Sequence, residues 1–347
     1  MRIPVPVRRP SVRIPPLQPR PAGSARGVDD VVRSPRRPAP PEDGYCPSEL
    51  DPDPRASCLI AGATETALGL VRHHHAPTRR SETATVLLHG AAGSWTTWTP
   101  ALRAARDAGH PLEDVVAVDL PGWGASAGPA DDARFTPEAV ADAVIRVVDD
   151  LGYVGCRIVG HSMGGFLALD LAARHPGRVR SVALVSPTLY SVMRSAAHPI
   201  LRFGTLPGFS MMLGSIHVTR LLGASGLAFV RMLQRAGLLR QLTRPLFAHG
   251  GRVRGSVIAA LAVEVRPRGF LRATEIAVAY PAGALWPRIA CPVTAVRGRR
   301  DVFVTPEDLA RLARDVPGAS SAVIADAGHF AHVERPTETL RALGLLP

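Results

Sequence analysis

The residues with the clearest chemical potential form a Gly-x-Ser-x-Gly motif at Gly160–Gly164, with Ser162 at its centre. The apolar stretch 156–159 before it predicts a short buried strand, and apolar residues at helical spacing in 165–174 predict a helix. A strand that turns abruptly into a helix through such a motif strains the serine backbone and exposes its hydroxyl above the sheet. Ser162 is therefore a candidate nucleophile.

A serine hydroxyl attacks a carbonyl only when a base removes its proton and an acid orients that base. His329 follows a predicted strand at 321–325, and Asp301 follows another at 292–298. Both are expected on loops at the carboxyl edge of the sheet, where open α/β sheets place their active sites. The chain order serine, aspartate, histidine is that of enzymes built on this turn.

Two backbone amides complete the predicted machinery. The predicted strand 85–88 runs into a loop of small residues, 90–93, which allows a substrate to approach the backbone closely. An oxyanion hole needs one N–H from the residue after the nucleophile and one from this earlier loop. The predicted donors are Met163 and Ala91, and His89 is expected to hold the loop by hydrogen bonds.

Other residues compete for these roles. Asp326 or Asp315 could serve as the acid in place of Asp301. Asp326 lies three residues before His329 on the same loop, so we expect it to cap the turn. His332 competes with His329 as the base, but it lacks a preceding glycine.

Together these motifs resemble the α/β-hydrolase superfamily, of the single-domain esterase, lipase and C–C hydrolase type. The matching segments are His89-Gly90, Asp119–Ser126, Gly160–Gly165, Gly298 with Asp301, and Gly328-His329. The resemblance covers roughly residues 58–347. It implies an α/β fold with a mostly parallel eight-stranded sheet flanked by helices, and a helical cap inserted after the sixth strand. Some relatives carry the acid where this chain has Ser186-Pro187-Thr188, which favours Asp301. The aspartate of 119–126 is expected to anchor its loop.

The net charge of +12 comes with no lysine, so all 41 basic residues are arginine. Nine of them lie within residues 1–41, against Asp29 and Asp30. The remainder is only mildly basic and carries no nucleic-acid-binding motif, so we expect no nucleic-acid partner.

Composition also suggests the domain organisation. Residues 1–53 are rich in proline and arginine and are expected to be disordered. They contain no apolar signal-peptide core, and the scattered cysteines do not suggest disulfides, so a cytoplasmic location is expected. Residues 54–347 form the predicted hydrolase domain, including a helical cap at 188–286.

Within the cap, Phe209, Met211, Met212 and Phe229 either line an apolar substrate cavity or form the cap's own core. The uncharged run 203–219 is shorter than a bilayer span and contains Pro207, so stable membrane insertion is not expected. His73–His75 lie at the polar end of a strand. Alternate residues there face opposite ways, so no metal site is predicted.

The resemblance implies a serine hydrolase that cleaves an ester, thioester or related acyl bond of a small apolar molecule, without a cofactor. Cleavage of a C–C bond or acyl transfer by the same triad is the alternative, and a non-catalytic ligand-binding protein is a third reading. Haloalkane dehalogenase and epoxide hydrolase chemistry is disfavoured, because those families place an aspartate where this chain has Ser162. The sequence makes no prediction of the oligomeric state.

Overall fold

A computed structural model describes residues 43–129, 131–198, 204 and 206–347. Eight strands form one sheet in the order β1-β2-β4-β3-β5-β6-β7-β8. β1 and β2 pair antiparallel, β2 pairs antiparallel with β4, and all other neighbours are parallel. The expected mostly parallel eight-stranded sheet is confirmed. The strands are β1 Ile60–Thr66, β2 Gly69–His75, β3 Thr83–Leu88, β4 Val115–Val118, β5 Gly155–His161, β6 Val179–Val185, β7 Val293–Gly298 and β8 Ser320–Ile324.

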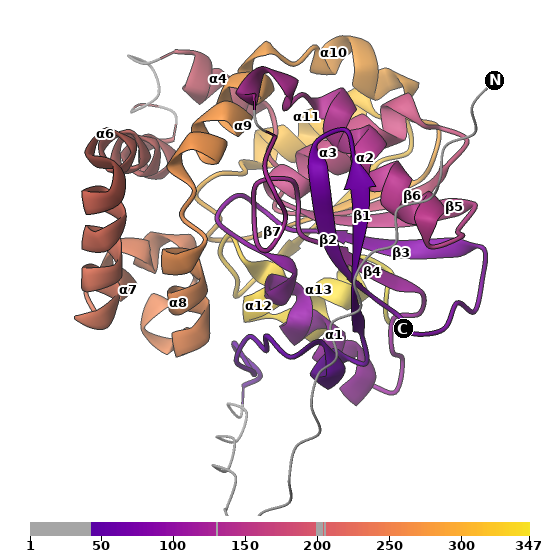
Figure 1. Cartoon of the computed structure of the whole chain (residues 1–347), viewed down its shortest axis with the longest axis horizontal. Helices are drawn as coiled ribbons and strands as arrows, with labels where there is room; N and C mark the ends of the chain where they lie inside the picture. Colours follow the sequence, from indigo (N-terminus) through magenta and orange to yellow (C-terminus); the bar gives the residue numbers. More distant parts are fainter. Residues whose placement is uncertain (1–42, 130, 199–203, 205) are drawn as a thin grey trace, which may run out of the picture. The chain divides into compact units, whose positions relative to one another are not determined.

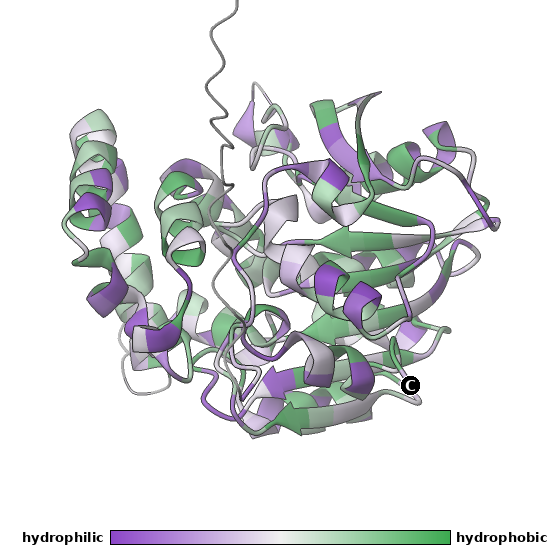
Figure 2. Cartoon of the chain, turned by 90° about the horizontal axis from the view of Figure 1, so that it is seen from below, coloured by the Kyte–Doolittle hydropathy of each residue, from purple (hydrophilic) through white to green (hydrophobic). Residues whose placement is uncertain are grey.

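The central strands are apolar on both faces, as parallel strands covered on both sides must be. In β3, Val86 and Leu88 point into one core, and Leu87 points into the other. The first core packs beneath α2 (Pro137–Asp150), α3 (Met163–Arg174) and α11 (Pro306–Asp315). The second packs beneath α1 (Thr99–Asp107) and α13 (Pro336–Ala342). Figure 1 shows these two groups of helices on opposite sides of the strands, and Figure 2 shows the apolar colouring of the strands between them.

Proline and side-chain caps set where several helices begin. Pro137, Pro306 and Pro336 each open a helix, at the position where a missing N–H costs nothing. At α11, Thr305 and Asp308 form a capping box in which each side chain accepts a hydrogen bond from the other's backbone N–H. Of these helices, α11 and α13 follow the segments that carry Asp301 and His329, so their starts help to fix those segments.

The helical cap lies between β6 and β7, as expected. Its helices are α4 (Tyr190–Ala197), α6 (Pro207–Arg235), α7 (Leu239–Thr243), α8 (Gly255–Val263), α9 (Pro267–Ala279) and α10 (Ala282–Leu285). Phe209, Leu213 and Ile216 of α6 pack with Phe270 of α9 and with Phe303 of the sheet domain. The remaining elements are α12 (Ala331–Glu334) and the short 3₁₀ turns Pro54–Ser57, Trp95–Trp98, Asp132–Arg134, Arg244–Leu246, Gly250–Arg252 and Trp286–Arg288.

The expectation of disorder through residue 53 is wrong for residues 43–53, whereas residues 1–42 lie outside the described residues. Tyr45 and Cys46 are fully buried, and Leu50 is buried with them, against α8 and the loop before it. The Tyr45 hydroxyl donates a hydrogen bond of 2.7 Å to the buried Glu334 carboxylate. The buried side chains of Tyr45, Cys46 and Leu50 thus order a segment whose composition alone suggests disorder.

Tyr45 provides a test of this packing. Tyr45→Ala should lower the free energy of unfolding by about 3–5 kcal/mol, because it empties a large buried site. Tyr45→Phe removes the two hydrogen bonds of the hydroxyl, one to Glu334 and one from the His249 N–H, and should cost about 1–3 kcal/mol. Urea denaturation followed by circular dichroism measures both values. A Tyr45→Ala protein as stable as the wild type would show that this segment does not pack as described.

Candidate active site

Ser162 lies between β5 and α3 in a backbone conformation that non-glycine residues rarely adopt, with φ 52° and ψ −116°. Its N–H donates to the Val185 carbonyl at 3.0 Å, and its own carbonyl accepts from Thr188 N–H at 2.9 Å. The strained turn is therefore fixed to the end of β6 and the loop after it. This is the strand–turn–helix context that the sequence predicts for the serine.

Glycines allow the turn to pack against its neighbours. An added Cβ at Gly164 would lie 2.3 Å from the Leu88 carbonyl oxygen, and one at Gly160 would lie 2.4 Å from the Gly164 carbonyl oxygen. A Cβ at Gly165 would lie 2.8 Å from the Pro187 side chain. Any side chain at these positions would push the start of α3 away from β3 and displace Ser162.

Asp301 and His329 meet as the sequence predicts. The loop after β7 brings the Asp301 Oδ1 atom to 3.1 Å from His329 Nδ1. The same carboxylate oxygen accepts from the Phe303 N–H at 2.9 Å, which fixes its orientation. Both side chains are almost fully buried, with exposed fractions of 0% for Asp301 and 5% for His329.

The charge state of Asp301 suits this contact. Burial alone would raise the pKa of the Asp301 carboxyl. The positive charge that His329 can carry, together with hydrogen bonds from His329 and from the Phe303 N–H, outweighs burial and holds that pKa below its usual value. Asp301 is therefore a carboxylate that accepts a hydrogen bond from the His329 Nδ1–H. When His329 is neutral, this tautomer leaves Nε2 without a proton, so Nε2 is the basic nitrogen.

The competing acids have other partners. Asp326 lies 2.5 Å from His249 Nε2 and binds the Arg335 guanidinium. Asp315 accepts a 2.7 Å hydrogen bond from the Tyr190 hydroxyl. Among the described residues, Asp301 is the acid that contacts the His329 imidazole.

The competing histidine is enclosed. His332 has no exposed surface, and its ring packs 4.5 Å from the Trp98 ring. Burial, and to a lesser extent the charge of His329, lowers the pKa of His332 to about 3. His332 is absent from the residues that line the cavity containing Ser162, so it does not replace His329.

Sequence reasoning missed the residues that hold the base. His161, the variable residue of the Gly-x-Ser motif, is buried, and its Nε2 lies 3.0 Å from the His329 carbonyl oxygen. The His329 N–H donates to the cap carbonyl of Leu246 at 2.8 Å. Glu334 accepts from Gly328 N–H at 2.9 Å. The position of His161 within the motif was the only signal in the sequence, and it did not reveal this contact.

The two predicted oxyanion donors face the same cavity as Ser162. Met163 is the first residue of α3, where backbone N–H groups have no partner within the helix. The Ala91 N–H makes no hydrogen bond to any other described residue. His89 holds this loop: Leu120 N–H donates to its Nε2 at 3.0 Å, so Nδ1 carries the proton and donates to the Gly90 carbonyl at 2.8 Å.

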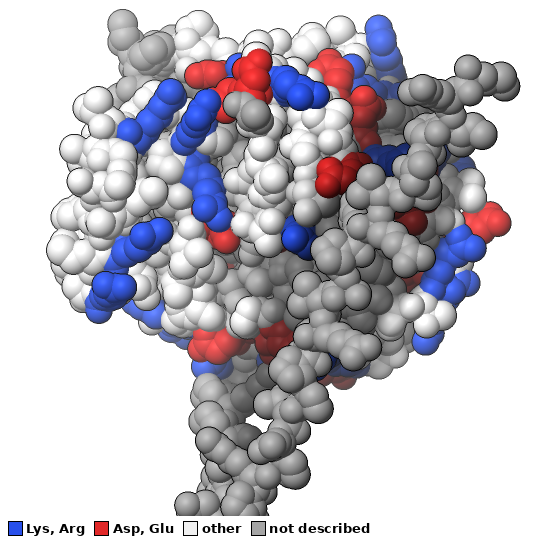
Figure 3. Space-filling model, in the orientation of Figure 1, with Lys and Arg blue, Asp and Glu red and all other residues white. Residues whose placement is uncertain are grey.

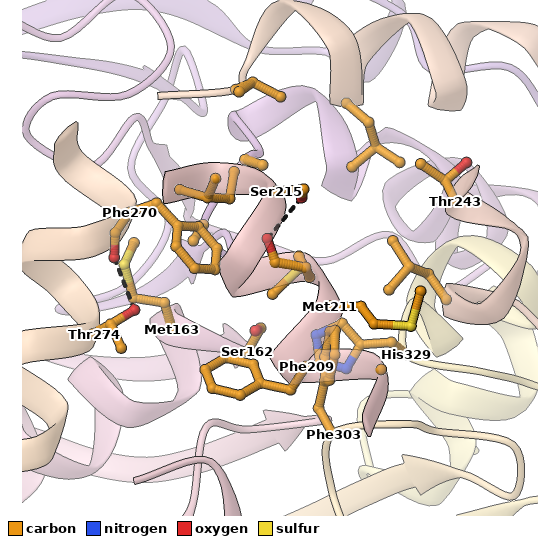
Figure 4. Close-up of a pocket in the computed structure, with 18 of the residues that line it drawn as sticks. Ser162, Met163, Phe209, Met211, Ser215, Thr243, Phe270, Thr274, Phe303 and His329 are labelled. Carbon is orange, nitrogen blue, oxygen red and sulfur yellow. Dashed lines mark hydrogen bonds between the residues drawn. The ribbon is translucent and has the colours of Figure 1, made fainter. Parts of the chain in front are cut away.

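A cavity of about 640 Å³ lies over these groups and extends under the cap. Ser162 and His329 line its floor, with Phe303 beside the histidine at a ring distance of 4.5 Å. Phe209, Met211, Met212 and Phe229 all line the cavity, and Phe209 also belongs to the cap core. Figure 4 shows Ser162 and His329 from the sheet domain close to Phe209 and Met211 of α6. None of the described lining residues is charged.

The three consecutive histidines of β2, His73–His75, do not share one face of the strand. His74 stacks on Trp95 at a ring distance of 4.1 Å, whereas His73 and His75 face each other on the opposite side of the strand, 5.1 Å apart. Within the described ranges, no group of three histidine, cysteine or acidic residues could hold a metal ion.

Comparison with known proteins agrees with this geometry. Residues 84–336 match the family described as the alpha/beta hydrolase fold. The chain belongs to the alpha/beta hydrolase fold family. With esterases and other hydrolases among its relatives, it is a hydrolase enzyme.

Relatives of this alpha/beta hydrolase include several enzyme types. The pimeloyl-[acyl-carrier protein] methyl ester esterase of Chromobacterium violaceum is 30% identical over 227 residues, which are 65% of this chain and 80% of the esterase. The bifunctional epoxide hydrolase 2 of Rattus norvegicus is 24% identical over 286 residues, which are 75% of this chain. The matched region spans 50% of the rat enzyme's length.

Solved structures share the fold of this alpha/beta hydrolase. A thermophilic esterase from Thermogutta terrifontis superposes with a TM-score of 0.61 at 21% identity, covering 82% of this chain and 97% of the esterase. The enol-lactonase from Burkholderia xenovorans LB400 superposes with a TM-score of 0.59 at 20% identity, covering 82% of this chain and 100% of the lactonase.

The buried His332 predicts a pH dependence of stability. A histidine in the unfolded chain has a pKa of about 6.5. Below that value the unfolded state binds a proton that the folded state, with its pKa of about 3, does not. The free energy of unfolding should therefore fall on acidification, by about 1.4 kcal/mol per pH unit for this residue.

His332→Leu should flatten this slope between pH 6 and pH 4 by about one proton. The exposed His110 provides a control, because its ring is solvated in both states. Denaturant unfolding at several pH values measures the slope. If His332→Leu and His110→Leu proteins share the wild-type slope, His332 is not held neutral in the folded state.

Proposed function

We propose that this hydrolase cleaves esters through an acyl-enzyme on Ser162. His329 Nε2 removes the hydroxyl proton, and Ser162 Oγ attacks the substrate carbonyl. Asp301 holds the imidazole in the required tautomer and stabilises its charged form. The supporting observation is the buried Asp301–His329 pair beside a strained serine that faces an apolar cavity.

The remaining steps follow from the same groups. The amides of Met163 and Ala91 stabilise the oxyanion, and the positive end of the α3 dipole adds to them. His329 then gives its proton to the leaving alcohol, and water releases the acyl group by the reverse sequence. No hydrogen bond joins Ser162 Oγ to His329 in the described part of the chain, so that contact has to form as the substrate binds.

The cavity limits the substrate class. Its lining is aliphatic and aromatic apart from hydroxyl groups and the histidines His161 and His329, and it offers no charged partner among the described residues. Burying a charged group there without a partner would cost several kcal/mol. We therefore propose an uncharged, apolar acyl group as the part of the substrate that lies under the cap.

Relatives support ester cleavage over the alternatives. Esterases occur both among the matched sequences and among the superposed structures. Epoxide hydrolases also match, yet this chain has a serine at the nucleophile position where covalent epoxide opening uses a carboxylate. C–C cleavage and acyl transfer would use the same triad, and an acetyltransferase component also matches, but over only 29% of this chain, against 65% for the esterase.

A panel of p-nitrophenyl esters tests the proposal. Neutral acyl chains of graded length should be hydrolysed, whereas esters of equal length with a terminal carboxylate should react far more slowly. Ser162→Ala should lower kcat/KM by about four orders of magnitude or more, and should abolish labelling by a fluorophosphonate.

Ser215 offers a matched control, because it also lines the cavity but its hydroxyl donates to the Met212 carbonyl. Ser215→Ala should retain both labelling and turnover within a few-fold. Undiminished hydrolysis by the Ser162→Ala protein, or labelling at another serine, would refute the serine assignment.

A further inference from the structure

The outer side of the cap carries large apolar side chains that face water. Nine of the thirteen exposed large hydrophobic residues in the described chain lie between Met211 and Val263. We call this surface the apolar cap face, and its residues are Met211, Val218, Leu221, Leu222, Phe229, Met232, Leu238, Leu242 and Val263. Leu221 is the most exposed, at 86%. Exposed apolar patches of this kind mark interaction surfaces in soluble proteins.

Helix α6 supplies most of this face because it is apolar on both sides. Phe209, Leu213 and Ile216 recur at helical spacing on its buried side. An ordinary surface helix would place polar residues on the other side. Here the exposed side carries Leu221 and Leu222, and Figure 2 shows apolar segments interrupted by polar ones along the helix at the left. Burial of the inner side of the first half of α6 in the cap core leaves the outer side of that half for a partner.

The same helix is long and apolar enough to cross a membrane, with a mean hydropathy of 1.3 in its best window. Its backbone nevertheless breaks at Gly223, where φ is 55° and ψ is −127°. Arg220 and Arg231 flank that break, and the inner side of the first half packs on the cap core. This combination suits a helix that lies in a membrane interface better than one that spans the bilayer.

The charged side chains of α6, α7 and α8 are of one sign, whereas the cap's acids, Glu264 and Glu275, lie beyond α8 and pair with Arg266 and Arg272. The sequence contains no aspartate or glutamate between Asp170 and Glu264, a stretch that includes α6, α7 and α8. The exposed arginines on α6 and directly after α7 are Arg220, Arg231, Arg235 and Arg244, and none of these four forms an ion pair with another described residue. Exposed Arg252, before α8, pairs with Asp43. Figure 3 shows arginines scattered over an otherwise uncharged surface on the side where α6 and α7 lie in Figure 1.

The apolar cap face is continuous with the cavity. Met211, Val218, Leu222, Phe229 and Leu242 are exposed to solvent and also line the space that leads to Ser162. The mouth of the cavity therefore opens within the apolar cap face. An apolar molecule could pass from a hydrophobic phase against this face into the cavity without crossing water.

We propose that the apolar cap face docks peripherally on a lipid bilayer that contains anionic lipids. Such a surface offers acyl chains to the exposed leucines and negative headgroups to the unpaired arginines. A second copy of this chain fits less well, because two apolar cap faces placed together would bring arginines against arginines with no acidic residue between Asp170 and Glu264 to pair with them. A soluble acidic protein would pair with the arginines, but binding of such a protein would not explain why the mouth of the cavity opens within the apolar cap face.

Docking on a membrane is independent of the proposed ester chemistry, so an experiment can contradict one proposal without contradicting the other. Binding is measured by co-sedimentation of the full chain with vesicles of phosphatidylcholine, with or without phosphatidylglycerol. Catalysis is measured on a soluble short-chain ester. The wild type should bind the anionic vesicles, bind neutral vesicles much more weakly, and lose affinity as salt is raised.

Two cap variants test the two halves of the proposal. Leu221→Glu with Met232→Glu changes exposed residues outside the cavity lining, and should weaken binding to anionic vesicles about tenfold or more. Arg220→Gln with Arg231→Gln and Arg235→Gln should weaken it on the order of a hundredfold, at about fivefold for each arginine near the surface. Both variants should retain turnover of the soluble ester.

The matched control changes an exposed valine and an exposed arginine away from the cap, Val154→Glu with Arg314→Gln. It should bind as the wild type does. Three outcomes would overturn the proposal: no binding to anionic vesicles, equal binding by the cap variants and the control, or a cap variant that only dissociates an oligomer in sedimentation velocity. Binding through residues 1–42 would give the second outcome, because every variant retains them.

Discussion

The close approach of two backbones, where α3 begins against the end of β3, is the constraint on which the site depends. Gly164 has no room for even a Cβ beside the Leu88 carbonyl, and this contact gives Ser162 its strained conformation. The same contact brings the amide of Met163, at the start of α3, to the loop after β3, where Ala91 lies. The candidate nucleophile and the proposed oxyanion donors are therefore positioned by one packing requirement, before any substrate binds.

The proposed base, His329, and its proposed acid, Asp301, depend on a second set of contacts, which converge on the loop after β8. A Cβ at Gly298 would lie 2.1 Å from the Gly328 carbonyl oxygen, so the loops that carry Asp301 and His329 are pressed together. His161 contacts the His329 carbonyl from the nucleophile turn. The Leu246 carbonyl of the cap also accepts a hydrogen bond from the His329 N–H. Movement of the cap would therefore shift the position of His329.

Much of this arrangement could be predicted because it rests on local patterns. The turn around Ser162, the strand before Asp301 and the glycine before His329 each have a signature a few residues long. The contacts between distant segments had none: Tyr45 joins Glu334 across 289 positions, and His161 joins His329 across 168. Composition predicted disorder for residues 43–53, but the segment is ordered because Tyr45, Cys46 and Leu50 are buried against the domain. The apolar outer side of α6 was hidden because its leucines fit an ordinary buried helix equally well.

The central claim is that Asp301, and not Asp326, orients the base. Asp301→Asn and Asp326→Asn should be compared by kcat on one ester, at equal folded fraction by circular dichroism. Asp301→Asn should lower kcat by about three to four orders of magnitude, because His329 would then take the wrong tautomer. Asp326→Asn should change kcat little, since its partners are His249 and Arg335 at a partly exposed site. A more crippled Asp326→Asn protein would contradict this account of the site.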